Sequence, residues 1–145
     1  MKNSCKLKIY IFQVLSFSLL FLLPIYANAQ KSDEQTAVAS AEHFLQLIDS
    51  GKYQESWQQT APIFMSQVSR KHWAEKLQGL RPPFGAAEKR TIKAAHHATS
   101  LPGAPEGEYV VFQFDTRFAN KKGAIETVTM SHIGGEWLVA GYFIQ

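Results

Sequence analysis

Among the side chains that could do chemistry, Glu126 is the strongest candidate, because its neighbours are apolar. Alternate residues of an extended chain share a face, so Glu126 lies on the same side as Val128 and Met130. Loss of water disfavours the charged form of a carboxyl group there, unless a cation or several hydrogen-bond donors keep it ionised. Glu126 is therefore a candidate general base. The alternative is a structural ion pair with Arg81 or Arg90, which is the commoner arrangement.

The histidines do not predict a metal site. His96 and His97 are adjacent on a predicted strand, so their side chains point to opposite faces, and no nearby cysteine or acidic cluster supplies further ligands. His132 shares a strand face with Glu126, but the strand separates them by roughly 20 Å, too far for joint acid–base work. The sequence also lacks phosphate loops, nucleophile elbows, zinc-protease motifs and calcium loops. We therefore predict no cofactor and favour a non-catalytic protein over an enzyme.

Aromatic and cationic side chains elsewhere are candidates for a ligand pocket. Trp57 and Trp73 are flat and amphipathic, and they form either the core or the walls of a pocket in an incompletely filled core. Arg81 could bind a ligand carboxylate with two hydrogen bonds, or it could brace helix carbonyls or Glu126. The predicted ligand-binding residues are Trp57, Trp73, Arg81, Phe112, Phe114, Glu126 and Met130.

The elements that position these residues begin with helices. A capping-box pattern at residues 32–35 is followed by apolar residues at helical spacing up to Gly51, which predicts a first helix over that span. Pro62 interrupts a second short helix that begins near Lys52, and a turn or short helix follows it. Ser69 caps a third helix, which ends at Pro82-Pro83.

The second half of the chain alternates with period two, which predicts strands. Gly134-Gly135 is a two-residue hairpin turn, and residues 120–123 form another turn. Helices followed by a meander of strands predict an α+β fold, with the helices on one face of a curved, cone-like, four-stranded antiparallel sheet. The predicted strands are Arg90–Thr99, Tyr109–Phe118, Ala124–Ile133 and Glu136–Ile144.

Burial should decide which strand faces point inward. A slip of one residue in the central hairpin would exchange Phe112 and Phe114 for Gln113 and Asp115 on the inner face. The predicted core is Phe112, Phe114, Val128, Met130, Trp137, Val139 and Phe143, with Glu126 and His132 as its polar members. The outer face then carries a row of Asp115, Thr127 and Tyr142 with apolar patches from Ile125, Leu138 and Ile144. Such a face is a candidate homodimer interface.

Residues 1–29 have the features of a cleaved secretory signal. A lysine-rich start precedes an apolar run of about 15 residues, and Ala27-Asn28-Ala29 provides the small residues that a signal peptidase needs. The run is shorter than the roughly 20 residues that span a bilayer. We therefore predict cleavage after Ala29, export to the periplasm or beyond, and one domain over residues 30–145 without a membrane span.

The charge of the predicted mature chain argues against nucleic acid as a partner. The whole chain has 15 basic and 12 acidic residues, a net charge of +3. Three of the basic residues, Lys2, Lys6 and Lys8, lie in the predicted signal, so the mature chain is neutral. A neutral domain has no broad positive field to attract nucleic acid. With 46% hydrophobic and 19% charged residues, the chain is neither disordered nor built on disulfides.

The stretch from Ser100 to Gln145, with the upstream pieces DSGKYQESW and RPPFG, closely resembles the bacterial exported family catalogued as domain of unknown function 4019. The resemblance covers nearly all of the mature chain. The residues that match the family pattern are Trp57, Trp73, Arg81, Gly85, Glu108, Tyr109, Asp115, Phe118, Glu126, Thr127, Trp137, Gly141 and Tyr142. The family implies no activity. Its order of elements looks like the cone-shaped fold of nuclear transport factor 2 and its cystatin-like relatives, which often enclose an apolar pocket.

Three hypotheses about function follow from these observations. The leading one is a non-catalytic exported domain that binds a small, partly apolar ligand, or a partner, in the cone between helices and sheet. The second is an enzyme that uses Glu126 as a base with Arg81 or Tyr53 as its electrostatic partner. The third is an envelope interaction or dimerisation module that uses the outer face of the sheet.

Overall fold

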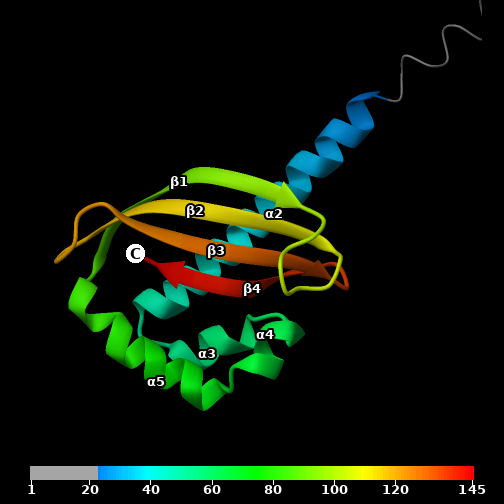
Figure 1. Cartoon of the computed structure of the whole chain (residues 1–145). Helices are drawn as coiled ribbons and strands as arrows, with labels where there is room; N and C mark the ends of the chain where they lie inside the picture. The colour runs from blue at the N-terminus through cyan, green and yellow to red at the C-terminus, as the bar shows by residue number, and fades with distance from the viewer. Residues whose placement is uncertain (1–22) are drawn as a thin grey trace, which may run out of the picture. The chain divides into compact units, whose positions relative to one another are not determined.

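The computed structural model describes residues 23–145, with side chains from residue 33 onward. Thr36–Gln145 forms one compact unit, and the description concerns that unit by itself. In chain order the described elements are α2 (Leu23–Asp49), α3 (Tyr53–Gln58), α4 (Pro62–Gln67), α5 (Arg70–Leu80), the 3-10 helix η1 (Pro82–Phe84), β1 (Ala87–Ala98), β2 (Glu108–Phe118), β3 (Ala124–Ile133) and β4 (Glu136–Ile144) (Figure 1). Helices followed by a four-stranded antiparallel sheet confirm the α+β class for the described chain.

The predicted signal lies outside the described residues as far as residue 22, and its remainder belongs to α2. Export therefore stays a prediction. Within residues 23–145, no helix combines the length and hydropathy that crossing a lipid bilayer requires.

Helix α2 begins earlier and ends where predicted. The expected start at Ser32 is wrong, because residues 25–31 contain no helix breaker and Pro24 lies in the first turn, where proline is tolerated. At the other end Gly51 has a φ of 70°, and its N–H donates to the carbonyl of Ile48. This left-handed glycine satisfies carbonyls that the end of a helix leaves free, so it ends α2.

The shorter helices are held together by tryptophan side chains. Trp57 of α3 donates from Nε1 to the carbonyl of Val68 at 2.7 Å. Trp73 of α5 donates to Ser56 Oγ of α3 at 3.0 Å. As predicted, Ser69 caps α5 by accepting from the backbone N–H of His72. Short helices are marginal on their own, so these hydrogen bonds and the core contacts stabilise them.

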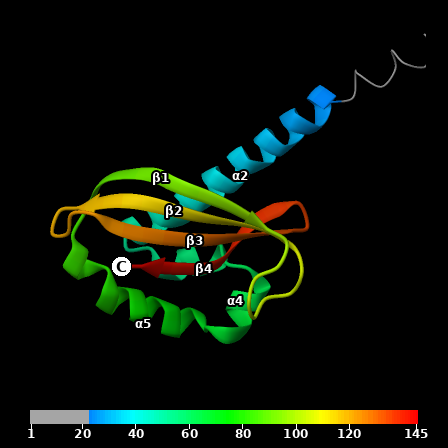
Figure 2. The ribbon, with the colours of Figure 1, turned by 45° about the horizontal axis from the view of Figure 1, so that its top comes forward.

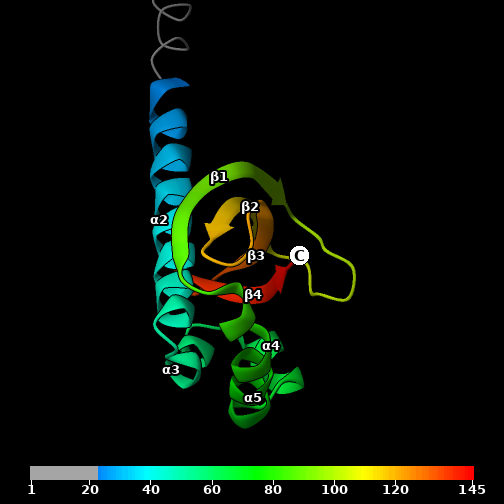
Figure 3. The same ribbon diagram turned by 90° about the vertical axis from the view of Figure 1, so that its left-hand side faces the viewer.

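The sheet has the strand order β1-β2-β3-β4, and each neighbouring pair is antiparallel (Figure 2). Figure 3 shows how strongly β1 curves. In the central hairpin Phe112 lies opposite Val128 and Phe114 opposite Glu126, which confirms the predicted register. The Gly134-Gly135 turn is also confirmed, since both glycines have positive φ.

Strand β4 departs from the predicted alternation. Thr129 lies opposite Gly141 but Met130 lies opposite Val139, so β4 has one extra residue and forms a bulge. The expectation that Phe143 is in the core is therefore wrong, because Phe143 is 59% exposed. Tyr142 and Ile144, expected on the outer face, lie opposite the inward residues Val128 and Glu126 instead. A glycine inside a strand is a known signal of such a bulge.

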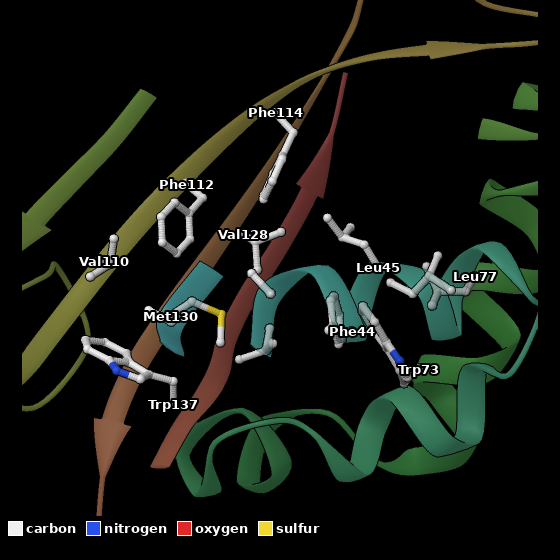
Figure 4. Close-up of a cluster of buried hydrophobic side chains, with 14 residues drawn as sticks. Phe44, Leu45, Trp73, Leu77, Val110, Phe112, Phe114, Val128, Met130 and Trp137 are labelled. Carbon is white, nitrogen blue, oxygen red and sulfur yellow. The ribbon is translucent and has the colours of Figure 1, made fainter. Parts of the chain in front are cut away.

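The core lies between the inner face of the sheet and helices α2 and α5. In Figure 4, side chains of β2, β3 and β4 approach Phe44 and Leu45 of α2 and Trp73 and Leu77 of α5. Phe44 and Trp73 stack with ring centroids 6.2 Å apart. The buried members of this cluster are Ala37, Ala41, Phe44, Leu45, Ile48, Trp73, Leu77, Val110, Phe112, Phe114, Val128, Met130, Trp137 and Val139.

The two outer strands of the sheet differ in how their edges are covered. Residues 59–61 run parallel to β4, where Ala61 donates to the carbonyl of Val139 and Val139 donates to that of Gln59. Strand β1 has shifts in register near Ala87 and Ile92, and Lys89 and Lys93 lie along its exposed length.

Candidate functional site

Glu126 is the centre of a buried polar network. Its side chain has no exposed surface. Its Oε2 accepts from Arg90 Nε at 2.8 Å and from Thr116 Oγ1 at 2.6 Å, and its Oε1 accepts from the Tyr142 hydroxyl at 2.7 Å. The inward orientation of Glu126 was predicted from strand alternation. Of the two cations proposed for an ion pair, Arg90 is the one that binds it.

Asp49 extends this network to the ends of two helices. Its Oδ2 accepts from Arg90 Nη1 at 2.8 Å, and its Oδ1 accepts from Arg81 Nη2 at 2.8 Å. Sequence reasoning missed Asp49, although a signal was present. A carboxylate in the last turn of a helix faces the negative end of the helix dipole, so a cation nearby is expected to compensate it. We call Asp49, Arg81, Arg90 and Glu126 the charge network.

One prediction was that Arg81 braces Glu126. In the structure Arg81 binds Asp49 instead. Only 4% of Arg81 is exposed, and its guanidinium lies over the ring of Phe118 at 4.5 Å. Among the described residues Nε and Nη1 of this side chain have no hydrogen-bond partner, and Nη2 binds Asp49. Arg81 is therefore a cation held between an aromatic ring and one carboxylate, at the point where α5 ends.

The charge network raises the pKa values of Arg90 and of the neighbouring Tyr142. Burial alone lowers the pKa of Arg90, but hydrogen bonds and the charges of Asp49 and Glu126 outweigh it and raise that pKa above its ordinary value. Burial, reinforced by the charge of Glu126, raises the pKa of the Tyr142 hydroxyl above its ordinary value. Two cations and two carboxylates cancel in formal charge, and a neutral tyrosine donates to one of the carboxylates.

The raised pKa of Tyr142 predicts a loss of stability in alkaline solution. Above pH 10 the unfolded chain releases the tyrosine proton before the folded protein does, so the free energy of unfolding falls as the pH rises. Between pH 9 and pH 11 this group should account for about 1 kcal/mol of that fall. Urea unfolding at both pH values should show a smaller fall in Tyr142→Phe. The neighbouring variant Phe143→Leu should keep the wild-type fall, and equal falls in all three proteins would contradict the prediction.

The predicted ligand-binding residues are divided between the core and its surroundings. Trp73, Phe112 and Met130 are at most 6% exposed and pack against other apolar side chains (Figure 4). Trp57 is half-buried at the edge of that cluster. These residues therefore belong to the apolar core between the helices and the sheet. Phe114 also belongs to the core, yet it lines a cleft open to solvent.

This cleft lies between α2 and β1 and has a volume of about 280 Å³. Glu42 and Gln46 line it from α2, and Arg90 and Ile92 line it from β1, with Phe114 of β2 beside them. We call it the α2–β1 cleft. Periodicity did not predict it, because the alternation of residues shows which face is inward and not where two elements separate.

A second hollow of about 250 Å³ lies beside α4. Ile63 and Phe64 line it from the helix, Tyr109 and Thr129 line it from the sheet, and the loop at residues 101–104 forms another wall. None of the described side chains that line it carries a charge. It contains no predicted site residue, so we treat it as a separate surface feature.

His132 and the outer face complete the predicted site residues. His132 is half-buried, with its ring stacked on Trp137 and Nδ1 3.0 Å from Glu108 Oε2. Tyr142 and Ile144, which were predicted on the outer face, point inward in the structure. The exposed ring of Phe143 lies on the outer face instead. A homodimer interface on this face stays a prediction.

Comparison with known proteins identifies one family. The model of a family described as "Protein of unknown function (DUF4019)" matches residues 40–142. No curated protein and no solved structure matches the chain significantly. The kinship with nuclear transport factor 2 and cystatin-like folds therefore stays an expectation. The matched span includes the whole charge network and every residue that lines the α2–β1 cleft.

Proposed function

The chain belongs to the family of proteins of unknown function DUF4019, and from this premise we propose that it is an exported, non-catalytic domain that binds a small, partly apolar ligand in the α2–β1 cleft. The observation that carries the proposal is the composition of the cleft. Ile92, which is 44% exposed, gives it apolar surface in front of the core residue Phe114, while Gln46 and Arg90 offer hydrogen bonds. Ligand sites combine these features, and a volume of about 280 Å³ suits a small molecule.

The environment of Glu126 favours binding over catalysis. A general base must lie within hydrogen-bond reach of the proton that it removes. Both oxygens of Glu126 already accept hydrogen bonds within the protein, and no surface of this residue is open to a substrate. The network supplies a rigid wall behind the cleft, because Arg90 both lines the cleft and binds Glu126.

Native mass spectrometry of the protein isolated from its own compartment tests this proposal. We expect the mass of residues 30–145, which would support cleavage after Ala29, together with additional mass from a bound small molecule. Ile92→Asp should abolish the additional mass, because it places a charge on the apolar wall. Ile133→Asp is the matched control, since Ile92 and Ile133 are 44% and 41% exposed and Ile133 does not line the cleft.

Two outcomes would contradict the proposal. Additional mass that survives in Ile92→Asp would place the ligand elsewhere, the uncharged hollow beside α4 being the first place to look. A bare polypeptide of doubled mass would favour the interaction module instead. Exposed Phe143 would then be the residue to replace on the outer face.

A further inference from the structure

The charged groups behind the α2–β1 cleft neutralise one another. Arg90, the one cation that lines the cleft among the residues that the structure describes, lies 2.8 Å from Asp49 and 2.8 Å from Glu126. Arg81 lies 2.8 Å from the same Asp49. An arginine with carboxylates on two sides offers little net attraction to a further anion, because any such anion would also meet the field of both carboxylates.

Glu42 is the charged group at the cleft that the network does not neutralise. It lies on the exposed side of α2, four residues before Gln46, so both side chains occupy the same face of the helix. Within residues 33–145 no cation forms an ion pair with Glu42. Glu42 therefore places a carboxylate without an ion-pair partner among residues 33–145 at the opening of the cleft, and its charge attracts cations.

Apolar surface lies across the cleft from this carboxylate. Ile92 is 44% exposed and supplies most of this surface, while Phe114 is only 1% exposed and lines the inner end of the cleft. A ligand that fits both features carries positive charge at one end and a hydrocarbon group at the other. The Gln46 side-chain carbonyl is a second acceptor for N–H groups beside Glu42.

We propose that the α2–β1 cleft selects small organic amines, with the ammonium group at Glu42 and Gln46 and the hydrocarbon group against Ile92 and Phe114. This inference rests on the proposed function and adds the chemical class of its ligand. An ammonium group donates up to three hydrogen bonds and accepts none, which suits a carboxylate and an amide oxygen. Carboxylic acids of the same size are disfavoured, because Glu42 repels them.

Three probes of nearly equal shape and different charge test this inference on the full-length protein. Benzylamine, benzyl alcohol and benzoate are titrated at neutral pH while amide NMR signals are followed. We expect all shifts to centre on Gln46, Ile92 and Phe114. Benzylamine should bind up to about fivefold more tightly than benzyl alcohol, the range of an exposed ion pair, and benzoate should bind most weakly. Added salt should reduce the preference for the amine.

A pair of variants isolates the contribution of Glu42. Glu42→Gln should reduce benzylamine affinity to that of benzyl alcohol while leaving the alcohol unchanged. Glu55→Gln removes the same charge from α3, where Glu55 lies 3.6 Å from Lys52, and should keep the wild-type preference. Both side chains are exposed, so neither replacement disturbs the core.

The outcomes separate this inference from the proposed function. Probes that shift the cleft signals without preference for the amine, or with a preference that Glu42→Gln leaves intact, would overturn the amine inference alone. The cleft would then remain a binding site of another selectivity. No shift at the cleft with any of the three probes would overturn the proposed function and this inference together.

Discussion

Replacement of Glu126 by glutamine will lower the free energy of unfolding by about 3–5 kcal/mol. The amide keeps the size of the side chain but removes the charge that faces Arg90 at 2.8 Å. Arg90 is then left with Asp49 alone, and Asp49 also serves Arg81. The side chain of Arg90 is only 16% exposed, so water replaces the lost partner only in part, and this is the origin of the cost. Urea unfolding followed by tryptophan fluorescence measures the change.

Asp115→Asn is the matched control for this replacement. Asp115 is an exposed acid on β2, and the same acid-to-amide change there should alter the free energy of unfolding by less than about 0.5 kcal/mol. A loss below about 1 kcal/mol in Glu126→Gln would contradict the buried ion pair. It would mean that water reaches Arg90 and compensates its charge.

Phe112→Ala will destabilise the protein by about 3–5 kcal/mol, whereas Phe143→Ala will change its stability by less than about 0.5 kcal/mol. Phe112 has no exposed surface and lies in the core cluster, so its removal leaves a cavity between sheet and helices. Phe143 is 59% exposed, and its removal leaves none.

The pair tests the bulge in β4, because a strand without it would turn Phe143 inward. Thermal or urea unfolding of both variants decides between the two registers. Equal and large losses would contradict the bulge and restore the register expected from simple alternation. Small losses of stability in both variants would mean that neighbouring side chains fill the space left by Phe112. That result would contradict a tightly packed core.

The sequence predicted those elements whose local signals agree with burial. The register of the central hairpin followed because only one of two alternatives turns Phe112 and Phe114 inward. Gly51 and Pro82 ended helices as expected, since each acts through its own backbone. The start of α2 was missed, because a capping pattern at Ser32 competes with a chain that is helical on both sides of it.

The register of β4 could not be predicted from alternation alone. A bulge changes the phase of every residue after it, and here the phase changes beside Gly141. The bulge matters for the candidate site. Tyr142 was predicted on the outer face, but in the structure it points inward and its hydroxyl donates to Glu126. A glycine between apolar strand residues was the available signal, but glycine also occurs in regular strands.

The inward orientation of Glu126 was predicted from the sequence, whereas the α2–β1 cleft was not. Glu126 lies inward beside an arginine, as strand alternation and the nearby cations indicated. Whether the interior is filled depends on how side chains from α2, α5 and the sheet fit in three dimensions, which periodicity does not report. One open cleft lies where α2 and β1 separate, with Glu42 and Ile92 at its walls.

The irregular outline of β1 has a consequence for the behaviour of the protein at high concentration. A straight strand with free backbone groups recruits other chains and can seed fibrils. Two changes of register and the side chains of Lys89 and Lys93 prevent a long, flat match with an incoming strand. At the opposite border of the sheet, the backbone N–H and carbonyl of Val139 already form hydrogen bonds with residues 59–61. The architecture therefore resists polymerisation through the borders of its sheet.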